Sequence, residues 1–131
     1  MVRCVARARP AKAGPDEWLR RARRYLRIAK SILDDGFADA ASFYAQQAAE
    51  FALKALQLHQ SGTITKTHDL PRLAGLVSAP ARIVNLATLA TYAYVAARYP
   101  DVPGTRITRR RAEVYLDAAR RILRWVRQKM V

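Results

Sequence analysis

The sequence predicts an all-α fold, an antiparallel up-and-down bundle of four long helices plus one short helix. Apolar residues recur at spacings of three and four, which is the period of an amphipathic helix, and almost no alternating strand pattern occurs. The chain has only 5 glycines and 6 prolines, so long stretches contain no helix breaker. With 131 residues, 51% of them apolar, it is long enough for one domain and too apolar to be disordered.

Proline and glycine residues near the start of the chain separate an arm from the predicted bundle. We expect residues 1–14 to form a flexible basic arm and residues 15–131 to form the helical bundle. The first helix begins at Pro15 or Asp16, because proline suits the first turn and acids suit the positive end of the helix dipole. Gly36 supplies the left-handed residue that ends it.

The second predicted helix follows Phe37, with Asp39 as its N-cap. It is rich in alanine, so neighbouring helices can approach it closely. Ser61 and Gly62 end it.

A short third helix opens at the sequence Thr-His-Asp-Leu-Pro. Thr67 or Asp69 caps this helix and Pro71 lies in its first turn. It ends by Ser78. A fourth helix runs from about 80 to 97.

The loop after the fourth helix is set by Pro100, Pro103 and Gly104, which cannot continue a helix. Thr108 is the expected cap of the last helix, which spans about 109–130.

Positive charge is concentrated at the two ends of the chain. Lysine and arginine number 24 and aspartate and glutamate 10, which gives a formal charge of +14. Ten bases and two acids lie in 1–30, four bases and five acids in 31–97, and ten bases and three acids in 98–131. The two basic ends are either a contact surface for a polyanion or the solvated, arginine-rich exterior of a heat-adapted protein.

Several classes of site are excluded by composition. The lone Cys4 allows no disulfide and no cysteine-pair zinc motif, and two histidines are too few for a multi-histidine metal site. Five isolated glycines form no phosphate-binding loop, so we expect no metal and no cofactor. The chain has no run of about 18 apolar residues and no apolar stretch behind its basic start. We therefore expect a cytoplasmic protein that does not contact the membrane.

Three segments together carry a family pattern. The first is the alanine-rich stretch 43–56, which contains Gln-Gln-Ala-Ala-Glu followed by a lysine. The second is Lys-Thr-His-Asp-Leu at 66–70, and the third is Ala-Arg-Tyr-Pro-Asp at 97–101, just before the basic last helix. In this order and spacing they resemble the HEPN domain (higher eukaryotes and prokaryotes nucleotide-binding), over roughly residues 16–130.

The resemblance implies a small antiparallel helical bundle that is often a homodimer. In prokaryotes many such proteins are encoded beside a minimal nucleotidyltransferase, and such pairs can act as toxin and antitoxin. Many members are metal-independent RNases, with an Arg followed four to six residues later by a His, near the start of the last long helix or in the loop before it.

This chain departs from the RNase signature. No His follows Arg98, where the resemblance places the motif, and no Arg lies between Arg27 and Arg72 to precede His59 or His68. General acid–base catalysis contributes roughly 10²- to 10⁴-fold, so the loss of this His disfavours RNA cleavage.

We therefore predict a non-catalytic HEPN protein that binds a nucleotidyltransferase partner, a nucleotide or RNA. The alternative is a metal-independent, toxin-like RNase with an atypical site built from Arg98, Tyr99, Asp101 and the cluster 109–111.

The first candidate site residues are Gln47, Glu50 and Lys54, whose spacing places them on one face of the second helix. They form either a polar pocket for a nucleotide or the dimer cleft, or simply a Glu50–Lys54 pair of a kind worth about 0.2–0.5 kcal/mol.

The second group, Thr67, His68 and Asp69, is expected to cap the short helix, with a ligand contact by the His-Asp pair as the alternative.

The third group lies around the loop before the last helix. Either Arg98 and Asp101 form a bridge that locks the turn, or Arg98 contacts phosphate while Tyr99 offers a stacking face. Arg109 and Arg110 start the last helix, where the dipole disfavours bases. They either contact RNA or an acidic partner, or form a solvated helix start with pairing between Arg109 and Glu113.

Overall fold

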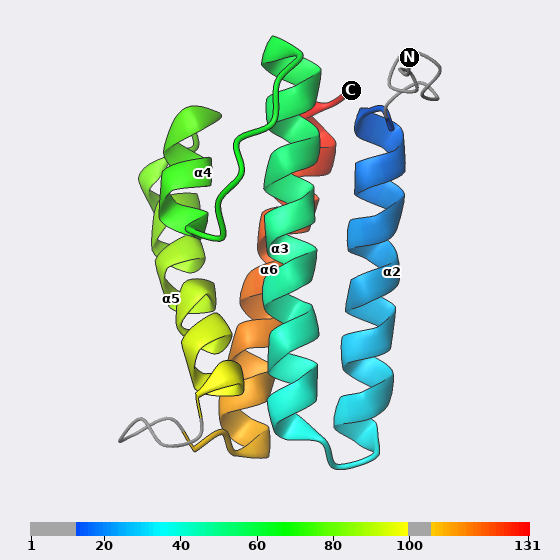
Figure 1. The fold of residues 1–131 in the computed structure, drawn as a ribbon, viewed down its shortest axis with the longest axis vertical. Helices are drawn as coiled ribbons and strands as arrows, with labels where there is room; N and C mark the ends of the chain where they lie inside the picture. Colours follow the sequence, from blue (N-terminus) through cyan, green and yellow to red (C-terminus); the bar gives the residue numbers. More distant parts are fainter. Residues whose placement is uncertain (1–12, 100–105) are drawn as a thin grey trace, which may run out of the picture.

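The protein is an all-α bundle, as predicted (Figure 1). The computed structural model describes residues 13–99 and 106–131, and these contain no strand. The helices are α2 (Pro15–Asp34), α3 (Ala38–Ser61), α4 (Leu70–Leu76), α5 (Ala81–Arg98) and α6 (Arg109–Lys129). Nearly all of the predicted arm lies outside the described residues.

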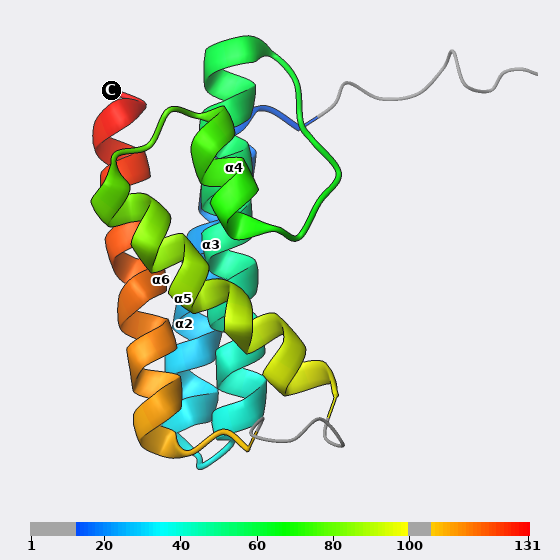
Figure 2. The same ribbon diagram turned by 90° about the vertical axis from the view of Figure 1, so that its left-hand side faces the viewer.

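The helix α3 is the centre of the bundle and contacts each of the other four helices. Figure 1 shows α2 on one side of α3 and α4 with α5 on the other, while α6 runs behind α3. In Figure 2, α5 crosses obliquely in front of α3 and begins beside the C-terminal end of α6. The helix α6 therefore lies between α2 and α5, and it contacts both.

Small side chains let the other helices approach α3 closely. Its alanines at positions 45, 48, 49, 52 and 55 are fully buried. On the α2 side the packing is aromatic: the rings of Trp18 and Tyr25 lie 4.9 and 5.2 Å from that of Phe51.

The helix ends follow the sequence signals, with one correction. Gly62 ends α3 in the left-handed conformation, with φ of 74°. The Thr108 side chain caps α6 by accepting a hydrogen bond from the Arg111 backbone N–H. The prediction for Asp39 is wrong, because Phe37 occupies the N-cap position of α3 and makes no side-chain cap. Asp39 lies inside the first turn, where an acid still favours the helix dipole.

Candidate functional site

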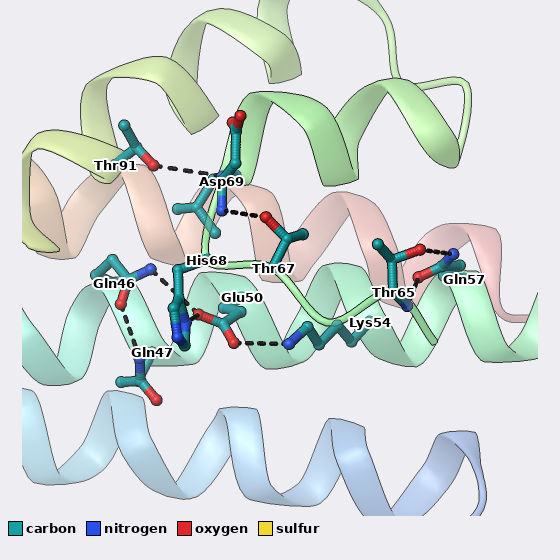
Figure 3. Close-up of polar contacts among 11 residues, drawn as sticks. Gln46, Gln47, Glu50, Lys54, Gln57, Thr65, Thr67, His68, Asp69 and Thr91 are labelled. Atoms are coloured by element: carbon teal, nitrogen blue, oxygen red, sulfur yellow. Dashed lines mark hydrogen bonds and ion pairs between the residues drawn. The ribbon is translucent and has the colours of Figure 1, made fainter. Parts of the chain in front are cut away.

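A buried carboxylate on α3 is the centre of a polar cluster (Figure 3). Glu50 is 2% exposed, and its Oε2 accepts a hydrogen bond from Lys54 Nζ at 2.8 Å. Its Oε1 lies 2.9 Å from His68 Nδ1 and accepts a longer bond of 3.3 Å from Gln46 Nε2. The pair of Glu50 and Lys54 is therefore present, but buried. Breaking such a buried pair costs about 3–5 kcal/mol, far more than an exposed pair contributes.

The His68 side chain connects three parts of the fold. It belongs to the loop between α3 and α4, it reaches Glu50 on α3, and its ring stacks on Tyr94 of α5. The two ring centroids are 4.9 Å apart and the planes are 20° from parallel. This arrangement holds the loop and α5 against the central helix.

Capping of α4 is done by the neighbours of His68. Asp69 is the N-cap, and its carboxylate accepts a hydrogen bond of 3.1 Å from the Arg72 backbone N–H. Thr67 Oγ1 accepts one of 3.1 Å from the Asp69 backbone N–H. His68 contacts Glu50 rather than a helix backbone.

Two further contacts hold the same loop. The Gln57 amide donates to Thr65 Oγ1 at 2.8 Å and accepts from the Thr65 backbone N–H at 3.0 Å. The Leu70 backbone N–H donates to Thr91 Oγ1 at 3.3 Å, which joins the start of α4 to α5. Hydrogen bonds with Gln57 of α3 and Thr91 of α5 thus hold both ends of this loop.

The buried amide beside Glu50 was missed from the sequence. Gln46 is fully buried, donates to Glu50 and accepts from the Gln47 side chain at 2.9 Å. Gln47, the predicted member of the cluster, is half-buried and acts through Gln46. The sequence did contain a signal for Gln46, because Gln46, Glu50 and Lys54 are spaced four residues apart and share one face of the helix.

The predicted residues near the last loop are described only in part. Arg98 is the last residue of α5, and Tyr99 follows as its C-cap, half exposed. Asp101 lies outside the described residues, so the Arg98–Asp101 bridge stays a prediction.

Arg109 joins the start of α6 to the end of α2. Its Nη1 donates to the Leu33 carbonyl at 3.0 Å, and its guanidinium also lies 3.5 Å from an Asp34 carboxylate oxygen. The predicted contact with Glu113 is present at 3.4 Å. A base at the positive end of α6 is thus placed at the negative C-terminal end of α2, which offsets the conflict with its own dipole.

The surroundings of Arg109 perturb one carboxyl group. The hydrogen bond from Lys30 lowers the pKa of Asp34, desolvation opposes it, and the charges of Lys30 and Arg109 add to the lowering. In the next turn of α6, a hydrogen bond to the Tyr115 hydroxyl raises the pKa of Arg111. Arg110 is exposed and forms no ion pair with any described residue.

A groove between α2 and α6 is lined by arginines from both basic ends of the chain. All of these arginines are exposed, and within the described ranges none has an acidic partner. Leu26 and Leu123 contribute apolar surface to it. The arginines are Arg23, Arg27, Arg120, Arg124 and Arg127.

A second basic groove lies on the other flank of α6, against α5. It has a volume of about 460 Å³ and is lined by Arg82, Arg121 and Arg124, with Leu86, Trp125 and Gln128. Arg121 pairs with Asp117 at 3.0 Å. Arg124 lines both grooves, so the two form one basic surface across α6.

Charge clustering in the sequence pointed toward this surface but could not locate it. The arginines of α2 and α6 recur at helical spacing, whereas their meeting depends on which helices are neighbours. Arg82 lies in the nearly neutral middle of the chain and has no sequence signal.

Two other classes of site can be addressed within 13–99 and 106–131. These residues contain no group of three or more His, Cys, Asp or Glu side chains placed to hold a metal ion. None of the helices there is long and apolar enough to cross a membrane.

The fold and the polar cluster define a class of small helical-bundle proteins with buried charge on the central helix. Within that class, the model of the HEPN domain family matches residues 15–129, and the chain belongs to this family. The resemblance found in the sequence is thereby confirmed.

Two solved structures have the same fold. The archaeal HEPN homologue ST0689 is 33% identical, with a TM-score of 0.78, over 92% of this chain and 100% of that one. TT1696 from Thermus thermophilus is 38% identical, with a TM-score of 0.79, over 88% of this chain and 97% of that one. A comparison with curated proteins gives no match.

Proposed function

We propose that this HEPN protein is a non-catalytic RNA-binding protein that uses the groove between α2 and α6. The observation that carries the proposal is the convergence of five exposed arginines from two helices on one groove. Guanidinium groups bind phosphate oxygens with two parallel hydrogen bonds, and each contact releases counterions.

The lack of acidic partners for the five groove arginines among the described residues supports a ligand role. Some other bases of α2 are paired instead: Arg20 lies 2.7 Å from Glu17, and Lys30 lies 3.1 Å from Asp34. Arginines that repel one another across a groove reduce stability slightly, and a bound polyanion removes that repulsion.

Salt-dependent RNA binding tests the proposal. The affinity of the full chain for a single-stranded RNA of about 20 nucleotides should fall steeply with salt, with a slope of about −0.7 per phosphate contacted. The variant Arg23→Gln/Arg27→Gln removes two groove arginines and should make the slope shallower by about 1.4.

A matched control separates the groove from overall charge. Lys66→Gln/Arg72→Gln removes the same charge from exposed positions in and near α4, and its slope should equal that of the native protein. Equal slopes for all three proteins, or no RNA binding, would overturn the proposal.

The homodimer is the second part of the proposal. Exposed apolar side chains follow one face of α5: Tyr92 is 59% exposed, Val95 41% and Tyr99 48%. Light scattering should give twice the mass of 14.8 kDa, and Tyr92→Glu/Val95→Glu should give a monomer that stays folded. A monomeric native protein contradicts it.

Metal-independent RNA cleavage is the second candidate function, and one contact favours it. Glu50 contacts His68 at Nδ1, while the His68 side chain is 57% exposed. A carboxylate placed in this way fixes the tautomer of a histidine that acts as a base. Cleavage of mixed RNA that survives EDTA, and is lost in His68→Ala or Arg98→Ala, would replace the binding-only function.

A nucleotidyltransferase partner and a toxin–antitoxin role rest on the family alone. A small nucleotidyltransferase reading frame beside the gene, and copurification of its product, would support the partner. Failure of the coexpressed pair to copurify would oppose it.

A further inference from the structure

The basic surface has arginines on both flanks of α6. Arg120 and Arg127 line the groove toward α2, and Arg121 lines the groove toward α5. Arg124 lines both. The two grooves lie on either flank of α6 and share Arg124, so together their arginines span a width of about 10 Å, the diameter of a helix with its side chains.

Each flank is completed by a neighbouring helix. Arg23 and Arg27 of α2 face the first groove, and Arg82 of α5 faces the second. In Figure 2, α5 begins beside the C-terminal part of α6. Arg82, near the start of α5, lines the same groove as Arg121. Both grooves therefore flank the same stretch of α6, from 120 to 128.

A single RNA strand has one row of phosphates and would occupy one of these grooves. A duplex presents two phosphate rows on either side of each of its grooves. These rows are separated by about 12 Å in the major groove of B-form DNA, and in RNA they border a wide, shallow minor groove. Arginines spread over about one helix diameter, roughly 10 Å, reach far enough to contact both phosphate rows that border a groove of a duplex.

The grooves also lack a surface for stacking unpaired bases. Proteins that bind single strands combine basic grooves with exposed aromatic rings. Trp125 lines the groove toward α5 but is only 4% exposed. Of the described residues, the exposed aromatic ones are Phe37, Tyr92 and Tyr99, and none of them lines either groove.

We propose that the ligand of this surface is double-stranded RNA, with one backbone on each flank of α6. This inference rests on the RNA binding proposed above and adds the base-paired state of the ligand. Recognition is by phosphate positions and duplex shape, because the grooves offer guanidinium groups and short apolar side chains but no exposed ring.

The test compares one RNA of about 20 nucleotides as a single strand and as a duplex with its complement, at constant salt. The native full chain should bind the duplex about tenfold more tightly. Arg82→Gln/Arg121→Gln removes only the flank toward α5. It should weaken duplex binding about fivefold or more and single-strand binding less than about twofold.

Two controls make the result specific. Lys66→Gln/Arg72→Gln has the same net charge and should change the affinity for both probes by less than about twofold. Circular dichroism checks that every variant is folded.

The outcomes separate this inference from the function on which it rests. Equal affinity of the native protein for both probes overturns the inference alone. A flank variant that weakens both probes equally also overturns it alone. If neither probe binds, the proposed RNA binding fails and the inference fails with it.

Discussion

The buried cluster around Glu50 and the arginine surface across α6 differ in whether their charged side chains are paired. In the cluster, Glu50 has three partners within 3.3 Å, and its closest, Lys54, is itself buried. On the surface, arginines from three helices lie side by side, and Arg121 alone among those lining the two grooves pairs with a described acid.

The difference follows from the cost of desolvation. A charge removed from water must be paired and hydrogen-bonded, so the buried pair of Glu50 and Lys54 serves to hold the loop and α5 in place. A solvated arginine needs no partner, so it remains free to bind a ligand from outside. The first region should therefore control stability and the second should control binding.

The largest effect on stability is expected from Glu50→Gln. The change leaves the buried Lys54 ammonium without a counter-charge, and we expect the free energy of unfolding to fall by about 3 kcal/mol. Denaturant titration measures it. The double variant Glu50→Gln/Lys54→Met should recover part of the loss, because neither charge remains buried. A loss below about 1 kcal/mol would show that the cluster is not a stabilising element.

A smaller effect is expected from His68→Ala. The change removes a half-exposed partner of Glu50 and the stacking on Tyr94, so we expect a loss of about 1 kcal/mol. Hydrogen exchange should rise in the loop 62–69 and leave α2 unchanged. Uniform exchange throughout the bundle would contradict the local role of His68.

The arginine surface should show almost no effect on stability. Arg23→Gln/Arg27→Gln should change the free energy of unfolding by less than about 0.5 kcal/mol, with stabilisation as the expected sign because repulsion is reduced. The same variant should lose RNA affinity. Destabilisation beyond that limit would mean that these arginines hold the fold, as the residues of the cluster do.

The smallest expected effect on stability concerns Asp34, which is exposed like the arginine surface but paired like the cluster. The Lys30 hydrogen bond and the Arg109 charge lower its pKa below the ordinary 3.8. A lowered pKa means that the carboxylate stabilises the fold above its unfolded pKa, and that this contribution disappears as the pH falls through the folded pKa. Between pH 6 and about pH 2, the native protein should lose more stability than Asp34→Asn. Parallel pH profiles would refute the coupling.

Helix positions were predictable because their signals are local. Pro15, Gly62 and Thr108 act on their own backbone, so the predicted ends agree with α2, α3 and α6 to within one or two residues. The prediction for Asp39 failed because Phe37 is the last residue before α3, and a carboxylate inside the first turn interacts favourably with the helix dipole without capping.

Part of the polar cluster was predictable for the same reason. The spacing of Glu50 and Lys54 places them together on any helix. Their burial, the contact of Glu50 with His68 and the stacking of His68 on Tyr94 were not predictable, because they depend on how the loop and α5 fold back over α3.

The sequence by itself determined the all-α class, the helix ends, the family and the basic character of both chain ends. All of these depend on residues near one another in the chain. The tertiary structure alone decided that α6 lies between α2 and α5. Helix neighbours are chosen by the packing of apolar faces, which leaves no mark in the spacing of surface charges. For this reason only the folded chain brings Arg27, Arg82 and Arg124 onto one surface.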